Sequence, residues 1–154
     1  MNSKDLNINY RIAQLEDVDA IYEFEVKLKF SDQDEEFEKM IAVWSSAYRK
    51  ESLEHYFKLG WSFIATNSDN KIVGFFLGQP LLFFDQQTQT LWIEHISSVN
   101  SNITTELIEI AYKLSREKHF QRVLLSENLQ NIKLEKSFPF QKWDRSTSLL
   151  KTTK

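Results

Sequence analysis

The chain has 154 residues, of which 42% are hydrophobic and 14% aromatic, which fits one globular domain and excludes a disordered or low-complexity protein. Cysteine is absent, which excludes disulfides, thiolate metal sites and a cysteine nucleophile. The net charge of −3 argues against a nucleic-acid partner or an anionic membrane surface, and no apolar run is long enough to span a bilayer. The polar first residues lack the apolar core of a signal peptide, so we expect one cytoplasmic domain over residues 1–154.

Glycine is scarce, with only 3 residues in the chain, well below the usual share of about 7%. They stand at positions 60, 74 and 78, so the sequence contains no Walker, G-x-G-x-x-G or G-x-S-x-G motif. The histidines are spaced too widely for a legible metal site. The motifs of P-loop enzymes, serine hydrolases and metalloenzymes are therefore missing.

The first third of the chain is expected to be mostly helical. A short strand over 10–13 precedes a helix over 17–29, whose buried positions recur at helical spacing. These positions are Val18, Ile21, Phe24 or Glu25, and Leu28. A second helix is expected over 32–48, and a third over 52–59 that ends at Gly60.

From Trp61 the pattern changes to that of strands. We expect strands over 61–66 and 71–78, joined by an Asn-rich turn at 67–70. The Gln-Pro pair that follows predicts a local interruption such as a bulge, before a further strand at 81–84.

The next strand, over 90–99, carries the polar residues of most interest. Alternation along a strand assigns its side chains to two faces. One face carries Leu91, Ile93, His95, Ser97 and Val99, and the other carries Trp92, Glu94, Ile96 and Ser98.

The rest of the chain returns to alternating helices and strands. A polar loop at 100–102 leads into a helix that runs to about residue 118, followed by a strand at 122–126, a helix at 128–136 and a final strand at 141–151. This order predicts an α/β (α+β) fold, with a mixed, mostly antiparallel sheet of about six to seven strands flanked by about four helices.

Three segments in this order resemble the GNAT-type acyl-CoA N-acyltransferase family. Residues 10–21 are similar to its opening strand and helix, and 62–75 to its central hairpin. Asn128 and residues 134–140 are similar to its late N-x-x-A-x-x-L-Y-x-K-x-G-F segment. The resemblance covers nearly the full chain. It implies a GNAT-like fold, an acetyl-CoA or other acyl-CoA cofactor, and transfer of the acyl group to a small-molecule or peptide amine.

The family's pyrophosphate loop, (Q/R)-x-x-G-x-(G/A), aligns with residues 99–104 and has lost its glycines. Val99, Asn102 and Thr104 replace the conserved types of the motif, although main-chain N–H groups and the start of a helix remain to hold an anion. The cofactor-binding residues implied by the resemblance are Ser97, Val99, Asn100, Ser101, Asn102, Ile103, Thr104, Thr105 and Asn128. Two interpretations stay open: weakened or altered CoA binding, and an ordinary helix cap with no ligand.

The resemblance also implies three catalytic candidates. Glu94 is expected to act as the general base that deprotonates the amine, and His95 as a base or an acceptor contact. Glu135 stands where many members carry the tyrosine that protonates the departing thiolate, although a solvated helix residue is the simpler interpretation. Because alternation separates Glu94 from His95, both can face one site only if the strand has a bulge or twist.

Two other functions stay open. One is a non-catalytic GNAT-like domain acting in protein interaction or ligand binding, with a possible homodimer contact through the aromatic stretch that includes Phe75, Phe76, Phe83 and Phe84. Core packing is the simpler interpretation of that stretch. The other is an unrelated α+β domain that binds a small molecule.

Overall fold

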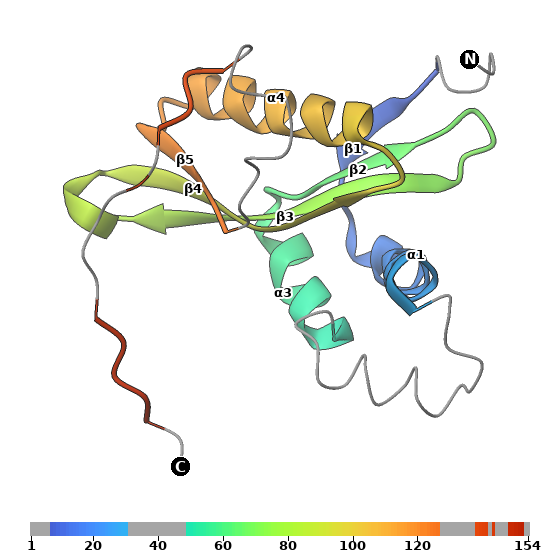
Figure 1. The fold of residues 1–154 in the computed structure, drawn as a ribbon, viewed down its shortest axis with the longest axis horizontal. Helices are drawn as coiled ribbons and strands as arrows, with labels where there is room; N and C mark the ends of the chain where they lie inside the picture. Colours follow the sequence, from blue (N-terminus) through green and yellow to red (C-terminus); the bar gives the residue numbers. More distant parts are fainter. Residues whose placement is uncertain (1–6, 31–48, 127–137, 142, 144–147, 153–154) are drawn as a thin grey trace.

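A five-stranded sheet forms the centre of the computed structural model, which describes residues 7–30, 49–126, 138–141, 143 and 148–152 (Figure 1). The strands are β1 (Asn9–Ile12), β2 (Phe63–Thr66), β3 (Ile72–Leu82), β4 (Gln89–Ser98) and β5 (Arg122–Leu125), in that spatial order. The α-helices of the described residues are α1 (Val18–Phe30), α3 (Lys50–Leu59) and α4 (Ser101–Glu117). Figure 1 shows α1 and α3 on one face of the sheet and α4 on the other.

The sheet is mixed and mostly antiparallel, as the sequence predicts. β1 to β4 pair antiparallel with their neighbours, and β5 runs parallel to β4 after the crossover through α4. The described part of the chain has five strands, fewer than expected, and the described residues of the strand expected over 141–151, which are 141, 143 and 148–151, form no strand. The helices expected over 32–48 and 128–136 lie outside the described residues.

β3 is one continuous strand, so the expected interruption at the Gln-Pro pair is wrong. Gln79 and Pro80 pair in register with Trp92 and Leu91 on β4. β2 ends before this part of β3, which leaves an open edge among the described strands where proline is tolerated. The residues expected to form a separate strand at 81–84 instead finish β3 and begin the hairpin turn.

Apolar side chains cover both faces of the sheet and define two core layers. The α4 layer contains Ala65, Phe76, Leu91, Ile93, Ile96, Ile103, Leu107, Ile108 and Ala111. The α1 layer contains Ala13, Val18, Ile21, Leu53, Phe57, Ile64, Phe75 and Leu77. Neighbouring residues Phe75 and Phe76 are both fully buried in opposite layers, which confirms core packing for them, whereas Phe83 at the hairpin tip is 79% exposed.

β4 contains a bulge at Glu94. On β3, Leu77 and Gly78 are adjacent, yet they pair with His95 and Ile93, so Glu94 is the extra residue. Ile93 packs into the α4 layer, whereas His95 faces Phe75 in the α1 layer. The strict alternation expected along 90–99 holds up to Glu94 and is wrong from His95 onward.

One edge of β4 is open beyond the bulge. β5 pairs with β4 only from Thr90 to Ile93, and Ser126 adds a last hydrogen bond to the Ile93 carbonyl at 3.0 Å. The Ser126 hydroxyl also donates to the Glu94 carbonyl, and past that point β4 has no hydrogen-bonded partner on this edge among the described residues. The Val99 amide donates to β3, so alternation turns the main-chain groups of Ile96 and Ser98 toward the open edge.

Gly78 is required by a close approach of the main chain just before the bulge. A Cβ atom at Gly78 would lie 2.3 Å from the carbonyl oxygen of Trp61. The Gly78 amide donates to Ser62 Oγ at 3.0 Å, and this hydrogen bond holds the main chain in place. The nearest atom to the added Cβ belongs to the main chain, so no flexible side chain can move aside to relieve the contact.

We expect Gly78→Ala to lower the free energy of unfolding by about 3 kcal/mol, because the added methyl group overpacks a site closed by main-chain atoms. Gly60→Ala is the matched control: its Cβ meets open space, and it loses only about 1 kcal/mol from the left-handed backbone at φ 76°. Urea denaturation measures both. Equal midpoints for the two variants would contradict the close approach.

Candidate active site

The Glu94 carboxylate lies on the face of the sheet that α1 and α3 cover. Trp92 precedes it by two residues on the same face, and its indole Nε1 donates to Glu94 Oε2 at 2.6 Å. Both side chains are half-buried. The hydrogen bond restricts the rotation of the carboxylate, which keeps its remaining lone pairs available to accept a proton.

Tyr56 on α3 lies within the electrostatic field of Glu94. The pKa of Tyr56 is raised above its ordinary value, first by burial and then by the negative charge of Glu94. Gly60, in the left-handed conformation at φ 76°, ends α3 and turns the chain back toward β2. The fold thus brings a carboxylate, an indole and a phenol together from β4 and α3.

His95 is buried beside Glu25 of α1. His95 Nε2 and Glu25 Oε2 are 3.3 Å apart, and each side chain is only 3% exposed. The sequence predicted that Glu94 and His95 could share a face only if the strand had a bulge or twist. The strand has that bulge, and both side chains point to the α1 side. The burial of His95 argues against direct contact between its ring and an acceptor.

The start of α4 presents free main-chain donors. Asn100 is the N-cap, and its side-chain oxygen accepts from the Ile103 amide at 3.0 Å. The Thr104 amide reaches the Asn100 carbonyl at 3.4 Å. The amides of Ser101 and Asn102 have no partner among the described residues, and both side chains are exposed. These two N–H groups, at the positive end of the helix, can hold an anion.

The side chains of the other predicted cofactor residues are buried, hydrogen-bonded within the fold, or apolar. Thr104 Oγ1 lies 2.6 Å from Ser98 Oγ and is buried, and Thr105 Oγ1 donates to the Ser101 carbonyl at 2.9 Å, so both hydroxyls have partners within the fold. Ile103 is buried in the α4 layer, Ser97 is buried on the other face, and Val99 is 52% exposed.

Nearby acids are engaged with other groups. Glu106 accepts a hydrogen bond from the Tyr10 hydroxyl of β1, and the pKa of Tyr10 is raised by burial and by this bond. Glu109 pairs with Lys113 at 2.7 Å along the helix surface. The repulsion that these carboxylates would exert on a phosphate is therefore reduced by partners that hold them.

Two predicted residues, Asn128 and Glu135, lie outside the described residues. Within the described part of the chain no cluster of histidine and carboxylate side chains could hold a metal ion. No helix in that part has the length and apolar character needed to cross a membrane.

Comparisons with solved structures bear on the fold that carries these residues. A possible acetyltransferase from Clostridium difficile 630 matches with a TM-score of 0.68 at 14% identity, covering 96% of this chain and 99% of that one. A predicted acetyltransferase from Clostridium acetobutylicum, solved with acetyl-CoA, matches at TM-score 0.63, 14% identity, and 93% and 96% coverage. The PaiA N-acetyltransferase from Thermoplasma acidophilum, in complex with coenzyme A, matches at TM-score 0.60, 16% identity, and 82% of each chain.

No protein-family model matches the sequence, and neither does any curated relative. At identities this low the structural match establishes architecture, and it spans nearly the whole chain. The chain has the GNAT-type acetyltransferase fold. The resemblance drawn from three sequence segments is therefore confirmed for the fold.

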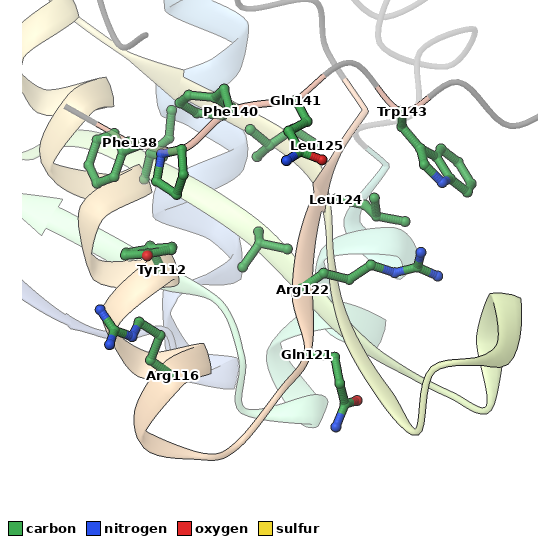
Figure 2. A pocket seen from close by; sticks show the side chains of 13 residues that line it. Tyr112, Arg116, Gln121, Arg122, Leu124, Leu125, Phe138, Phe140, Gln141 and Trp143 are labelled. Atoms are coloured by element: carbon green, nitrogen blue, oxygen red, sulfur yellow. The ribbon is translucent and has the colours of Figure 1, made fainter. Parts of the chain in front are cut away.

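The GNAT fold here also encloses a cavity far from the start of α4. It measures about 530 Å³ and lies between the second half of α4, β5 and the segment from Phe138 to Trp143 (Figure 2). Tyr112 of its wall is eleven residues beyond Ser101, or roughly 16 Å along the helix. Arg122 in the cavity is held by Asp85 at 2.7 Å. Its Leu124 and Leu125 pair with Trp92 and Ile93 of β4.

The sequence did not predict Trp92, Tyr56 or Glu25 as members of the candidate site. Trp92 and Tyr56 resemble ordinary core aromatics, and only the register of β4 and the placement of α3 bring them to Glu94. Glu25 carried a usable signal. It stands where helical spacing predicts an apolar residue, and a charged side chain at such a position needs a buried partner.

We expect Glu94→Gln to lower the pKa of Tyr56 toward its ordinary value, because the negative charge that raises it is removed while burial remains. NMR titration of the tyrosine ring carbons measures this shift. Glu109→Gln is the control, since that carboxylate lies on α4 beside Lys113 and should leave Tyr56 unchanged. An unaltered Tyr56 titration in Glu94→Gln would show that the charge of Glu94 does not act on Tyr56.

Proposed function

We propose that this protein transfers an acetyl or related acyl group from a CoA thioester to an amine. The observation that carries the proposal is the open edge of β4, which lies between the Glu94 carboxylate at the bulge and the free amides at the start of α4. One strand thus joins a proton acceptor to an anion site.

The donor set fits coenzyme A. The Ser101 and Asn102 amides and the positive helix end suit a pyrophosphate without needing a glycine, because every non-proline residue supplies an N–H. The main-chain groups of Ile96 and Ser98 can pair with the amides of a pantetheine arm laid along the open edge. Two solved neighbours of the same fold hold acetyl-CoA or coenzyme A, which supports a ligand of the CoA type.

Bound acyl-CoA would supply an activated acyl carbon. The amine nitrogen bonds to that carbon as the carbon–sulfur bond breaks, and the sulfur leaves as the thiolate of CoA. Glu94 accepts the proton that the amine loses, with its carboxylate oriented by the Trp92 indole at 2.6 Å. The thiolate takes up a proton in turn, for which Glu135 stays the predicted donor.

The amine would approach from the face covered by α1 and α3. Glu94, Trp92 and Tyr56 all lie there, on the opposite side of the sheet from α4. A carboxylate beside aromatic rings attracts an ammonium group and can then accept its proton. The acceptor is proposed to be a small-molecule or peptide amine.

A non-catalytic GNAT-like domain is the second candidate. The missing loop glycines favour it, as does Phe83, which is 79% exposed at a hairpin tip where it could contact a protein partner or a second copy. In that case neither acetyl-CoA binding nor acyl transfer would be found.

Calorimetric titration with acetyl-CoA tests the proposal. We expect heat of binding and a stabilisation of about 2.7 kcal/mol at a hundredfold excess over Kd. Transfer to a panel of primary amines is followed with a thiol reagent, which reports only released CoA because the chain has no cysteine. Absence of both binding and transfer would remove the proposal in favour of the non-catalytic domain.

Glu94→Gln identifies the base in the same assay. We expect kcat to fall about 10²- to 10⁴-fold while acetyl-CoA affinity stays near that of the wild type, because the variant keeps the shape of the side chain and loses proton acceptance. Glu109→Gln on α4 serves as the charge-matched control. Equal turnover by Glu94→Gln and the wild type would exclude Glu94 from the chemistry.

Asn102→Asp tests the anion site with effects of opposite sign. The added charge should stabilise α4 by about 0.5 kcal/mol while weakening acetyl-CoA binding about tenfold, since both act at the positive helix end. Lys118→Gln makes the same change in net charge at the other end of α4 and should leave affinity unchanged. Matching losses of affinity in the two variants would point to overall charge instead of the site.

A further inference from the structure

The pair formed by Glu25 and His95 is a deeply buried polar contact between α1 and β4. Its two side chains are each 3% exposed, and the His95 ring lies 5.5 Å from the ring of Phe75. The surrounding α1 layer is apolar. Polar groups in such a layer are costly to bury, so their presence at this place calls for a reason other than packing.

The pair lies directly after the bulge and constrains it. Ile93 is anchored in the α4 layer at 2% exposure, whereas His95 is anchored on the opposite face by Glu25. Residues two apart on a regular strand share one face, so these two anchors are incompatible with regular alternation. The strand accommodates both only by inserting an extra residue, and that residue is Glu94.

We propose that Glu25 and His95 are positioning residues, which hold the β4 bulge and thereby fix the orientation of the Glu94 carboxylate on the α1 face. The inference rests on the proposed function insofar as Glu94 is the base. Both side chains are only 3% exposed, so neither is proposed to contact the acyl group or the amine. They act through the strand, because a bulge held from α1 fixes both the direction of Glu94 and its distance from Trp92.

A purely structural pair makes a different prediction from a positioning pair. Replacing both members of a buried polar pair by apolar side chains is often neutral or stabilising. The double variant Glu25→Leu with His95→Leu should therefore fold, with Tm within about 5 °C of the wild type. If the pair only fills space, that variant also keeps its activity and its strand register.

If the pair positions Glu94, the double variant keeps acetyl-CoA binding but loses turnover by about 10²-fold, because the Ser101 and Asn102 amides lie beyond the bulge while the base is displaced. Turnover equal to the wild type overturns the proposal. Glu25→Gln keeps an oxygen that can accept from His95, so it should restore most of the turnover, whereas Glu25→Leu alone should not. Equal turnover by these two single variants also overturns it.

An NMR measurement tests whether the pair holds the bulge and needs no enzymatic activity. It uses single variants, so it remains possible if the double variant is too unstable to assay. Cross-strand contacts in the wild type should pair Leu77 with His95 and Gly78 with Ile93, with Glu94 unpaired between them. In Glu25→Leu we expect these contacts to weaken and the Glu94 amide signal to shift, while Glu25→Gln preserves them. An unchanged bulge in Glu25→Leu overturns the proposal. A wild type that binds no acetyl-CoA defeats the proposed function alone, because this measurement still tests the pair.

Discussion

β4 packs side chains into two apolar layers and, among the described residues, leaves part of one edge unpaired, and the other features of the site depend on that arrangement. β4 packs Ile93 and Ile96 against α4, yet directs His95 toward α1. Regular alternation cannot meet both demands, and the bulge at Glu94 resolves the conflict. The same irregularity separates the part of β4 that β5 covers from the part that stays open.

Charge is arranged so that the two ends of this open edge differ in sign. At the bulge stands a carboxylate whose negative charge reaches Tyr56 on α3. At the far end stand unpaired amides and the positive end of α4, while Glu106 is turned toward Tyr10. A ligand that is anionic at one end and meets an ammonium group at the other would match this polarity.

Local patterns in the sequence predicted most elements and failed where distant segments decide the geometry. Helical spacing located α1 and α4, and the loss of that spacing after Trp61 located the sheet. The bulge could not be predicted, because its cause is a contact between Glu25 and His95, which are 70 residues apart. For the same reason the sequence identified Glu94 as a candidate but placed it on the face opposite to His95, and it missed the aromatic residues around it.

Gly74 on β3 gives a structural reason why the loop before α4 can lack glycine. A Cβ atom on Gly74 would lie 2.8 Å from Cγ2 of Ile103, so the space that lets α4 begin close to the sheet is provided by β3 and not by the loop. The loop can then consist of residues with side chains, which have less conformational entropy to lose than glycine. Its amides are preorganised by the Asn100 cap before any ligand arrives. Such a loop would gain selectivity for one phosphate geometry and give up the adaptability that a glycine-rich loop retains.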